Sequence, residues 1–340
     1  MKKPLVVFGR PTQWVTQPAS QRYRFKHLGC LHGPSPALRD GAPAWDSVGA
    51  MLADSSLLDW AVDFFRVEKP DAFLFGPMYA KDGTKLQVAG VVGLLERLKT
   101  ASPGTRFLYW NGNQQGKLDF NLDAFRPFVD AVLTNTRDPR EHRNFYAAGI
   151  EKVDTLYQFG FDPEEHGRPQ TPEHDCHFAG SQTFSGRPTK YPNSEWRYRF
   201  LCEAAQRFDL VLYGKGQWPF AKRSHVVGQR FYDTFTEARV VLGANHWDYV
   251  RYYTRRTVYA LASGRPYVMR YVPGMECDFE NWRHLVWFTE IDEGLEAVQK
   301  LLGDPLLAER IGREGRQVAV ERFSWQALQR QLETLLDRGL

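Results

Sequence analysis

The chain has 340 residues, 43% hydrophobic and 25% charged, which is typical of globular proteins and long enough for two domains. Its formal net charge of +4 is compatible with anionic ligands but too small to indicate nucleic-acid binding alone. No apolar run approaches the roughly 20 residues of a membrane span, and the four cysteines show no paired spacing, so we expect a cytoplasmic protein with reduced thiols.

The first half alternates short apolar segments with longer amphipathic ones, the pattern of a parallel α/β sheet. We expect strands at 5–9, 71–76, 106–111, 130–135 and 152–157, and helices at 55–67, 86–99 and 139–148. Residues 14–27 interleave basic and aromatic side chains. They predict either an amphipathic helix with a solvated basic face or a surface for an anionic acceptor that includes Trp14, Arg22 and Arg24.

A polar, proline-rich stretch at 161–172 lacks periodicity and is the best candidate for a linker. Beyond it we expect strands at 177–180, 210–214, 240–243, 267–269 and 285–288, and helices at 196–208, 231–238, 255–263, 295–302, 304–323 and 324–336. We therefore divide the chain into domains 1–160 and 161–323, with a final segment 324–340. Two such halves predict a ligand cleft facing the carboxyl ends of both sheets.

The strand at 240–243 leads into a polar loop with Asn245 and His246, and then into a helix. That helix begins with Arg255 and Arg256 after Thr254, a good N-cap residue. A helix N-terminus attracts anions through its free N–H groups, and arginine adds charge-assisted bonds to phosphate. The pattern indicates a site for a phosphorylated ligand. The alternative is a solvated helix with two surface arginines.

Two glycine-containing loops after other strands predict further contacts to the same ligand, because small residues let backbone N–H groups approach an anion. The first loop holds Gly180, Ser181, Arg187 and Lys190, and the second holds Tyr213, Gly214, Lys215 and Gly216. In the first domain, Gly9 and Arg10 end the first strand, where such folds bring backbone toward the cleft.

Several catalytic patterns are missing: the phosphate loop of nucleotide triphosphatases, H-E-x-x-H, G-x-S-x-G and C-x-x-C. No Asp-x-Asp pair is present to hold a divalent ion under a diphosphate. His174, Asp175, Cys176 and His177 are metal-ligating types, but neighbours on a strand point to opposite faces. We therefore expect no metal and no resident cofactor, with the anion neutralised by basic side chains and helix N-termini.

Pieces of the second half resemble group 1 glycosyltransferases, most closely the spore-maturation-protein-like branch. They are the segments 178–181 and 212–218, Asn245, Arg256 with 260–264, and the tail 301–316. The resemblance covers roughly residues 175–335. It implies a GT-B fold: two Rossmann-like domains facing each other across a cleft, with the last helix crossing back to the first domain. It also implies metal-independent transfer from a nucleotide-sugar co-substrate held mainly by the second domain, with the acceptor bound mainly by the first. We expect the donor to be UDP-linked.

One departure from that family lies in the helix at 255–263. Many retaining members carry a pair of glutamates eight residues apart, and this chain has Arg251 and Tyr259 there. Tyr259 can stack on the donor or donate one hydrogen bond, but it cannot accept two hydroxyls as a carboxylate does. The sugar and the stereochemistry of transfer therefore stay open.

An inverting transferase needs a carboxylate or histidine beside the acceptor hydroxyl. Asp82, Asp119 and His32 are the candidate bases, each of which is otherwise an ordinary loop residue. The acceptor is open: a cell-envelope glycan, a small metabolite, a protein, or a hydroxymethylated base in duplex DNA, since phage-type DNA glycosyltransferases share this fold. Two other readings stand: an epimerase-like enzyme that transfers nothing, and an inactive nucleotide-sugar binding protein. The oligomeric state is open too.

Overall fold

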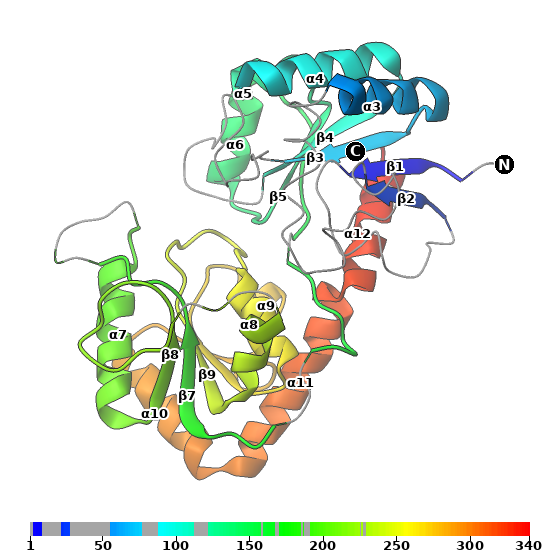
Figure 1. The fold of residues 1–340 in the computed structure, drawn as a ribbon. Coiled ribbons are helices and arrows are strands. Elements are labelled where there is room, and N and C mark those ends of the chain that lie inside the picture. The colour runs from blue at the N-terminus through cyan, green and yellow to red at the C-terminus, as the bar shows by residue number, and fades with distance from the viewer. Residues whose placement is uncertain are drawn as a thin grey trace. The chain divides into compact units, whose positions relative to one another are not determined.

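The computed structural model describes residues 3–8, 22–27, 55–76, 88–111, 122–157, 159–166, 170–184, 186, 191–224, 226 and 229–340. The chain divides into two compact units (Figure 1). Unit 1 comprises Met1–Gln158 and Leu328–Leu340, and unit 2 comprises Phe159–Ala327. None of the helices in the described ranges is long and apolar enough to cross a membrane.

Unit 1 is built on a six-stranded parallel sheet in the order β2-β1-β3-β4-β5-β6. Its strands are β1 (Leu5–Phe8), β2 (Arg24–His27), β3 (Ala72–Phe75), β4 (Arg106–Asn111), β5 (Ala131–Thr134) and β6 (Val153–Thr155). Its helices are α3 (Ser55–Glu68), α4 (Val88–Ala101), α5 (Leu122–Phe125) and α6 (Pro139–Ala147), with a 3-10 turn η3 (Arg126–Phe128). Asp138 caps α6 by accepting a hydrogen bond from the Arg140 amide.

Strand β2 corrects one expectation. Residues 24–27 do not belong to an amphipathic helix, because they pair in parallel with β1 from Leu5 opposite Arg24 to Phe8 opposite His27. The basic residues on this short segment hid its extended conformation, since edge strands often carry charged side chains.

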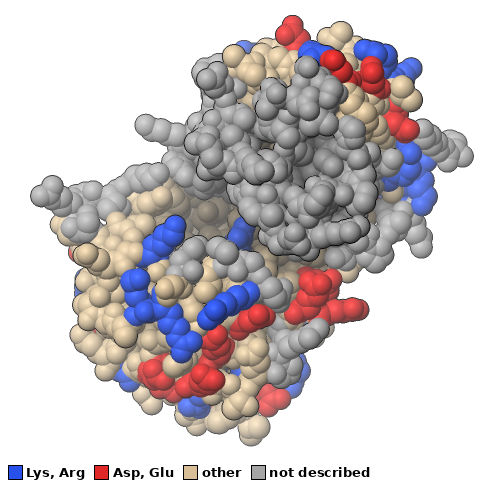
Figure 2. All heavy atoms as spheres, viewed as in Figure 1, with Lys and Arg blue, Asp and Glu red and all other residues tan. Residues whose placement is uncertain are grey.

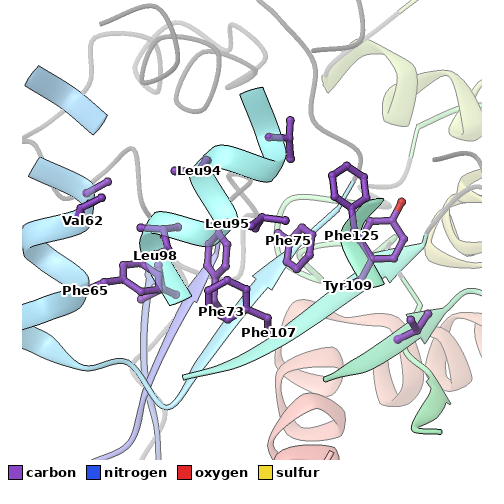
Figure 3. Close-up of a cluster of buried hydrophobic side chains, with 14 of the residues drawn as sticks. Val62, Phe65, Phe73, Phe75, Leu94, Leu95, Leu98, Phe107, Tyr109 and Phe125 are labelled. Carbon is purple, nitrogen blue, oxygen red and sulfur yellow. The ribbon is translucent and has the colours of Figure 1, made fainter. Parts of the chain in front are cut away.

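The core of unit 1 is aromatic (Figure 3). Phe73 on β3 and Phe107 on β4 are fully buried, and the ring of Phe65 on α3 meets Phe73 edge-on at a centroid distance of 5.4 Å. Leu95 and Leu98 of α4 close the same cluster. Burying each such side chain stabilises the fold by about 1.5–3 kcal/mol, so α3 and α4 are held firmly on this face of the sheet.

Unit 2 contains a five-stranded parallel sheet in the order β11-β10-β9-β7-β8. Its strands are β7 (His174–Ala179), β8 (Leu210–Tyr213), β9 (Ala238–Gly243), β10 (Tyr267–Arg270) and β11 (Val286–Phe288). Its helices are α7 (Ser194–Arg207), α8 (Gln229–Asp233), α9 (Arg255–Ala262), α10 (Ile291–Gly303) and α11 (Pro305–Phe323), with 3-10 turns η4 (Thr234–Thr236) and η5 (Met275–Cys277). After β7, the chain adds β8 on one side of it and then β9 on the other side. In open α/β sheets this reversal places a ligand crevice at the carboxyl ends of the strands.

The last helix, α12 (Trp325–Asp337), returns to unit 1, as the predicted fold requires. Ser324 caps its start by accepting a hydrogen bond from the Ala327 amide. Near its end, the Tyr23 hydroxyl donates to Asp337 Oδ1 at 2.6 Å, and Arg106 donates to the Leu340 carbonyl at 2.6 Å. These bonds join the C-terminal end of the chain to strand β4 and to the residue before β2.

The stretch expected to be a linker begins inside unit 2. Phe161 is fully buried, its amide donates to the Phe323 carbonyl, and its carbonyl accepts from the Trp325 amide. His166 is also buried, with its ring centroid 4.2 Å from that of Tyr232. The polar, proline-rich composition of 161–172 does not reveal these contacts, because they involve partners more than sixty residues away.

Candidate functional site

The carboxyl ends of β7 and β8 approach each other through two glycines. The Gly180 amide donates to the Tyr213 carbonyl and the Gln182 amide to the Lys215 carbonyl, both at 2.8 Å. A Cβ on Gly214 would lie 2.0 Å from the Gly180 carbonyl oxygen, so only glycine fits there. The two predicted loops, with Gly180 and Ser181 on one and Gly214 to Gly216 on the other, are thus brought side by side.

Arg256, in the first turn of α9, reaches the ends of β7 and β9. Its Nε donates to the Ala179 carbonyl and its Nη1 to the Ala244 carbonyl, the latter at 3.0 Å, while Cζ lies 4.5 Å from the centroid of the Phe178 ring. Its Nη2 makes no hydrogen bond to the described residues. A Cβ on Gly180 would lie 2.7 Å from Nη2, so the glycine leaves space for the guanidinium at the strand end.

Arg197 of α7 is a second arginine at the same place, and sequence reasoning missed it. It is only 1% exposed, its Nη1 bonds His246 Nε2 at 2.8 Å, and its Nη2 donates to the Ser181 carbonyl. Its Cζ lies 5.5 Å from the centroid of the Phe178 ring that Arg256 also faces. The available signal was spacing: Arg197 stands four and seven residues before the buried Leu201 and Ala204, on the apolar face of the helix.

The two guanidinium groups form a positively charged cluster without a carboxylate among their described contacts. Burial, and then the charge of Arg256, holds the pKa of Arg197 well below its usual value. Burial likewise lowers the pKa of Arg256. Arginine nevertheless keeps its proton near neutral pH. Among the described residues, these two poorly solvated positive charges face carbonyls, one imidazole and the Phe178 ring, a setting that favours binding of an anion.

His246 is held neutral beside these arginines. Burial, then Arg197 and then Arg256, lowers its pKa to about 2. Its Nε2 therefore accepts the hydrogen bond from Arg197, and its ring lies 4.5 Å from that of Tyr191. His246 thus adds no positive charge to the cluster and instead fixes the direction of Arg197.

Asn245 closes the loop between β9 and α9. Its Nδ2 donates to the Tyr252 carbonyl at 3.1 Å, and its Oδ1 accepts from the Thr254 hydroxyl at 3.5 Å. Thr254 is the N-cap of α9, where the first amides have no partner within the helix and the macrodipole is positive. Asn245 therefore sets where this N-terminus lies.

Two predicted donor residues have their side chains engaged elsewhere in unit 2. The Tyr213 hydroxyl donates to Glu237 at 2.6 Å and accepts from Arg223 at 2.7 Å. Tyr259 is 4% exposed, and its hydroxyl donates to that of Tyr232 at 3.0 Å. Tyr213 reaches the strand ends through its backbone carbonyl, while Lys215 stays exposed there.

The basic residues predicted to bind an acceptor are paired within unit 1. Arg22 forms an ion pair with Asp337, and Arg24 lies 3.6 Å from Glu68.

The other predicted site residues lie outside the described residues: Gly9, Arg10, Trp14, His32, Asp82, Asp119, Arg187 and Lys190. Within the described ranges, no group of three histidine, cysteine or acidic side chains is arranged to hold a metal ion. On the face of unit 2 drawn in Figure 2, Lys and Arg side chains lie beside acidic ones.

Two parallel Rossmann-like sheets, with the C-terminal helix returning to the first, define the GT-B architecture. Residues 194–334 match the model of a family described as glycosyl transferase-like, which places Arg197, Asn245, His246 and Arg256 inside the matched region. No curated protein matches the chain.

Solved structures of glycosyltransferases share the fold at low sequence identity. HepE from Anabaena, in complex with UDP and glucose, has a TM-score of 0.60 at 12% identity, covering 99% of this chain and 100% of its own. The sucrose-phosphate synthase from Thermosynechococcus elongatus has a TM-score of 0.56 at 12% identity, covering 99% of both chains. An alpha-glucosyltransferase in complex with UDP and a 13-mer DNA containing an HMU base has a TM-score of 0.60 at 11% identity, covering 84% of both chains.

Proposed function

We propose that this protein is a glycosyltransferase of the spore-maturation-protein-like branch that moves a sugar from a UDP-linked donor to an acceptor hydroxyl. The observation that carries the proposal is the pair Arg197 and Arg256, which face one aromatic ring at the ends of β7 and β9 without a carboxylate among their described contacts. A protein gains little stability from one buried and one half-buried charge placed side by side, so a ligand that compensates them is the simplest reason for their presence.

In this proposal the donor diphosphate lies over Gly180 and Ser181, next to Arg256 Nη2 and the first amides of α9. Transfer breaks the bond between the sugar C1 and the β-phosphate oxygen, which keeps the electron pair. The acceptor oxygen forms the new bond to C1 and loses its proton to a base, for which Asp82, Asp119 and His32 are the candidates. Arg256, Arg197 and the helix N-terminus stabilise the growing charge on the diphosphate. We propose that they do so in place of a divalent ion.

The comparisons support the donor class. Residues 194–334, which match the glycosyl transferase-like family, contain both arginines, and HepE was solved with UDP and glucose. Cys176, Cys202 and Cys277 are free thiols, which fits a reducing compartment, and we place the activity in the cytoplasm.

For the acceptor we propose that duplex DNA with a hydroxymethylated base is tested first, because a protein of the same fold was solved with DNA containing an HMU base. A DNA acceptor predicts binding that weakens steeply between about 50 and 200 mM salt, since phosphate contacts release counterions. A cell-envelope glycan is the second acceptor to test, and it predicts activity that varies little over the same range.

The experiment is to incubate the protein with UDP-glucose, with and without each acceptor, and to follow the products by NMR. Release of UDP together with a new glycoside supports the proposal. An isomerised UDP-sugar formed without acceptor would identify an epimerase instead. UDP binding without turnover of any donor or acceptor would indicate a binding protein, and absence of UDP binding would overturn the proposal.

A further inference from the structure

We infer that Asp278 is a positioning residue: through Arg251 and Tyr253 it sets the place of the loop that carries His246 and leads to Arg256. This inference rests on the proposed function, because it concerns the same anion site. Asp278 follows η5 and is 6% exposed, and its described hydrogen bonds go to side chains other than Arg197 and Arg256.

The Asp278 carboxylate gathers three side chains from two other segments. Its Oδ2 accepts from Arg251 Nε at 2.6 Å and from the Tyr253 hydroxyl at 2.8 Å. Its Oδ1 accepts from Arg251 Nη2 and from Arg322 Nη1, the latter at 2.5 Å. The bond set is bidentate toward Arg251, a geometry that fixes direction as well as distance.

The backbone at Arg251 shows that the loop is held in one unusual conformation. Arg251 has φ of 52°, in the left-handed region that residues other than glycine seldom occupy. Such a conformation persists only where the surroundings over-determine it. Here the Arg251 amide donates to the Pro273 carbonyl at 2.8 Å, and its guanidinium is clamped by Asp278.

Tyr253 carries this constraint to the anion site. It is 1% exposed and its ring meets Phe279 edge-on at 5.2 Å, so its position is fixed by packing as well as by Asp278. It directly precedes Thr254, the N-cap of α9, and stands three residues before Arg256. A shift of Tyr253 therefore moves the helix start and the guanidinium that bonds the Ala179 and Ala244 carbonyls.

The third partner of Asp278, Arg322, lies near the two segments that connect unit 2 to unit 1. Arg322 is in the last turn of α11, one residue before Phe323, whose carbonyl accepts the Phe161 amide. The two segments of unit 2 that lead to unit 1 end at Phe159 and Ala327. Asp278 thus bonds both the anion-site loop, through Arg251, and the end of α11, through Arg322, near the segments that lead to unit 1.

The test uses Asp278→Asn and Tyr253→Phe in the full chain, with Asp292→Asn as the matched control, because Asp292 pairs with Arg207 in an exposed ion pair of the same unit. Tyr253→Phe removes the hydrogen bond to Asp278 and leaves Arg251 and Arg322 paired with that carboxylate. It replaces Asp278→Asn as the test variant if that protein does not fold. Amide hydrogen exchange is measured without ligand, and UDP affinity by calorimetry.

We expect exchange at 246–257 to rise at least tenfold in Asp278→Asn, and less in Tyr253→Phe, while β7 and β9 keep their protection. UDP affinity should fall about tenfold, as expected when one charged hydrogen-bond partner of a binding loop is lost. Unchanged exchange at 246–257 in both variants, or a uniform rise across unit 2, would overturn the inference. Because exchange needs no ligand, failure of the wild-type protein to bind UDP would overturn only the proposed function.

Discussion

Arg197→Met offers a sharp prediction because it should change stability and binding in different ways. Methionine fills much of the volume of the arginine stem without a charge. The substitution removes two hydrogen bonds to a charged group, to Ser181 and His246, each worth about 1.5–3 kcal/mol. It also removes a buried charge whose desolvation costs several kcal/mol and that repels Arg256. The opposing effects are similar in size, so the free energy of unfolding should change by less than about 2 kcal/mol.

Binding has no such compensation. Loss of one guanidinium from the anion cluster should weaken UDP binding by about 1.4–3 kcal/mol, or roughly 10- to 150-fold in Kd. Urea denaturation and calorimetric titration with UDP measure the two quantities. Arg207→Met is the matched control on the same helix, since Arg207 is exposed and pairs with Asp292. Strong destabilisation with unchanged UDP affinity would refute the reasoning and leave Arg197 as a structural tie.

Two further predictions concern stability. His246 and His177 have pKa values lowered to about 2 and about 3, mainly by burial, so below the unfolded value near 6.5 the unfolded chain binds more protons. Stability should be fully present above pH 6.5 and fall by about 1.36 kcal/mol per pH unit for each histidine on acidification; urea titrations at several pH values should show His246→Gln with a shallower slope, and an unchanged slope would contradict this. Gly214→Ala would place a Cβ 2.0 Å from the Gly180 carbonyl oxygen and should cost about 1–3 kcal/mol or more, whereas Gly93→Ala, with open space in α4, should stabilise by up to about 1 kcal/mol in the same assay. Equal effects of the two alanines would refute the tight approach of the loops.

The parallel sheets were predictable because their strands are buried runs between amphipathic helices. The apolar segments at 71–76 and 240–243, for example, directly predicted strands β3 and β9. Strand β2 was not predictable in this way, because Arg24 and Lys26 interrupt its apolar pattern and its pairing with β1 is decided by tertiary contacts.

The candidate site shows the same difference between residues that local sequence identifies and residues that only tertiary contacts bring into place. Gly180, Gly214 and Arg256 follow strands or begin a helix, and local sequence identifies such positions. Arg197 lies in the first turn of α7, within a helix segment where an arginine usually faces solvent. Its role depends on Ser181 and His246, which are distant in sequence and close only after folding. Asp278 was hidden for the same reason.

The most direct test of the central claim is calorimetric titration of UDP, GDP and ADP into the wild-type protein, Arg256→Ala and Arg255→Ala, each with EDTA. Arg255 is the control because it neighbours Arg256 in the same helix turn but is exposed. The account predicts that UDP binds despite EDTA, that Arg256→Ala weakens binding at least about tenfold, and that Arg255→Ala changes it much less. Equal UDP affinity in all three proteins, or no nucleotide bound up to about 1 mM, would contradict it.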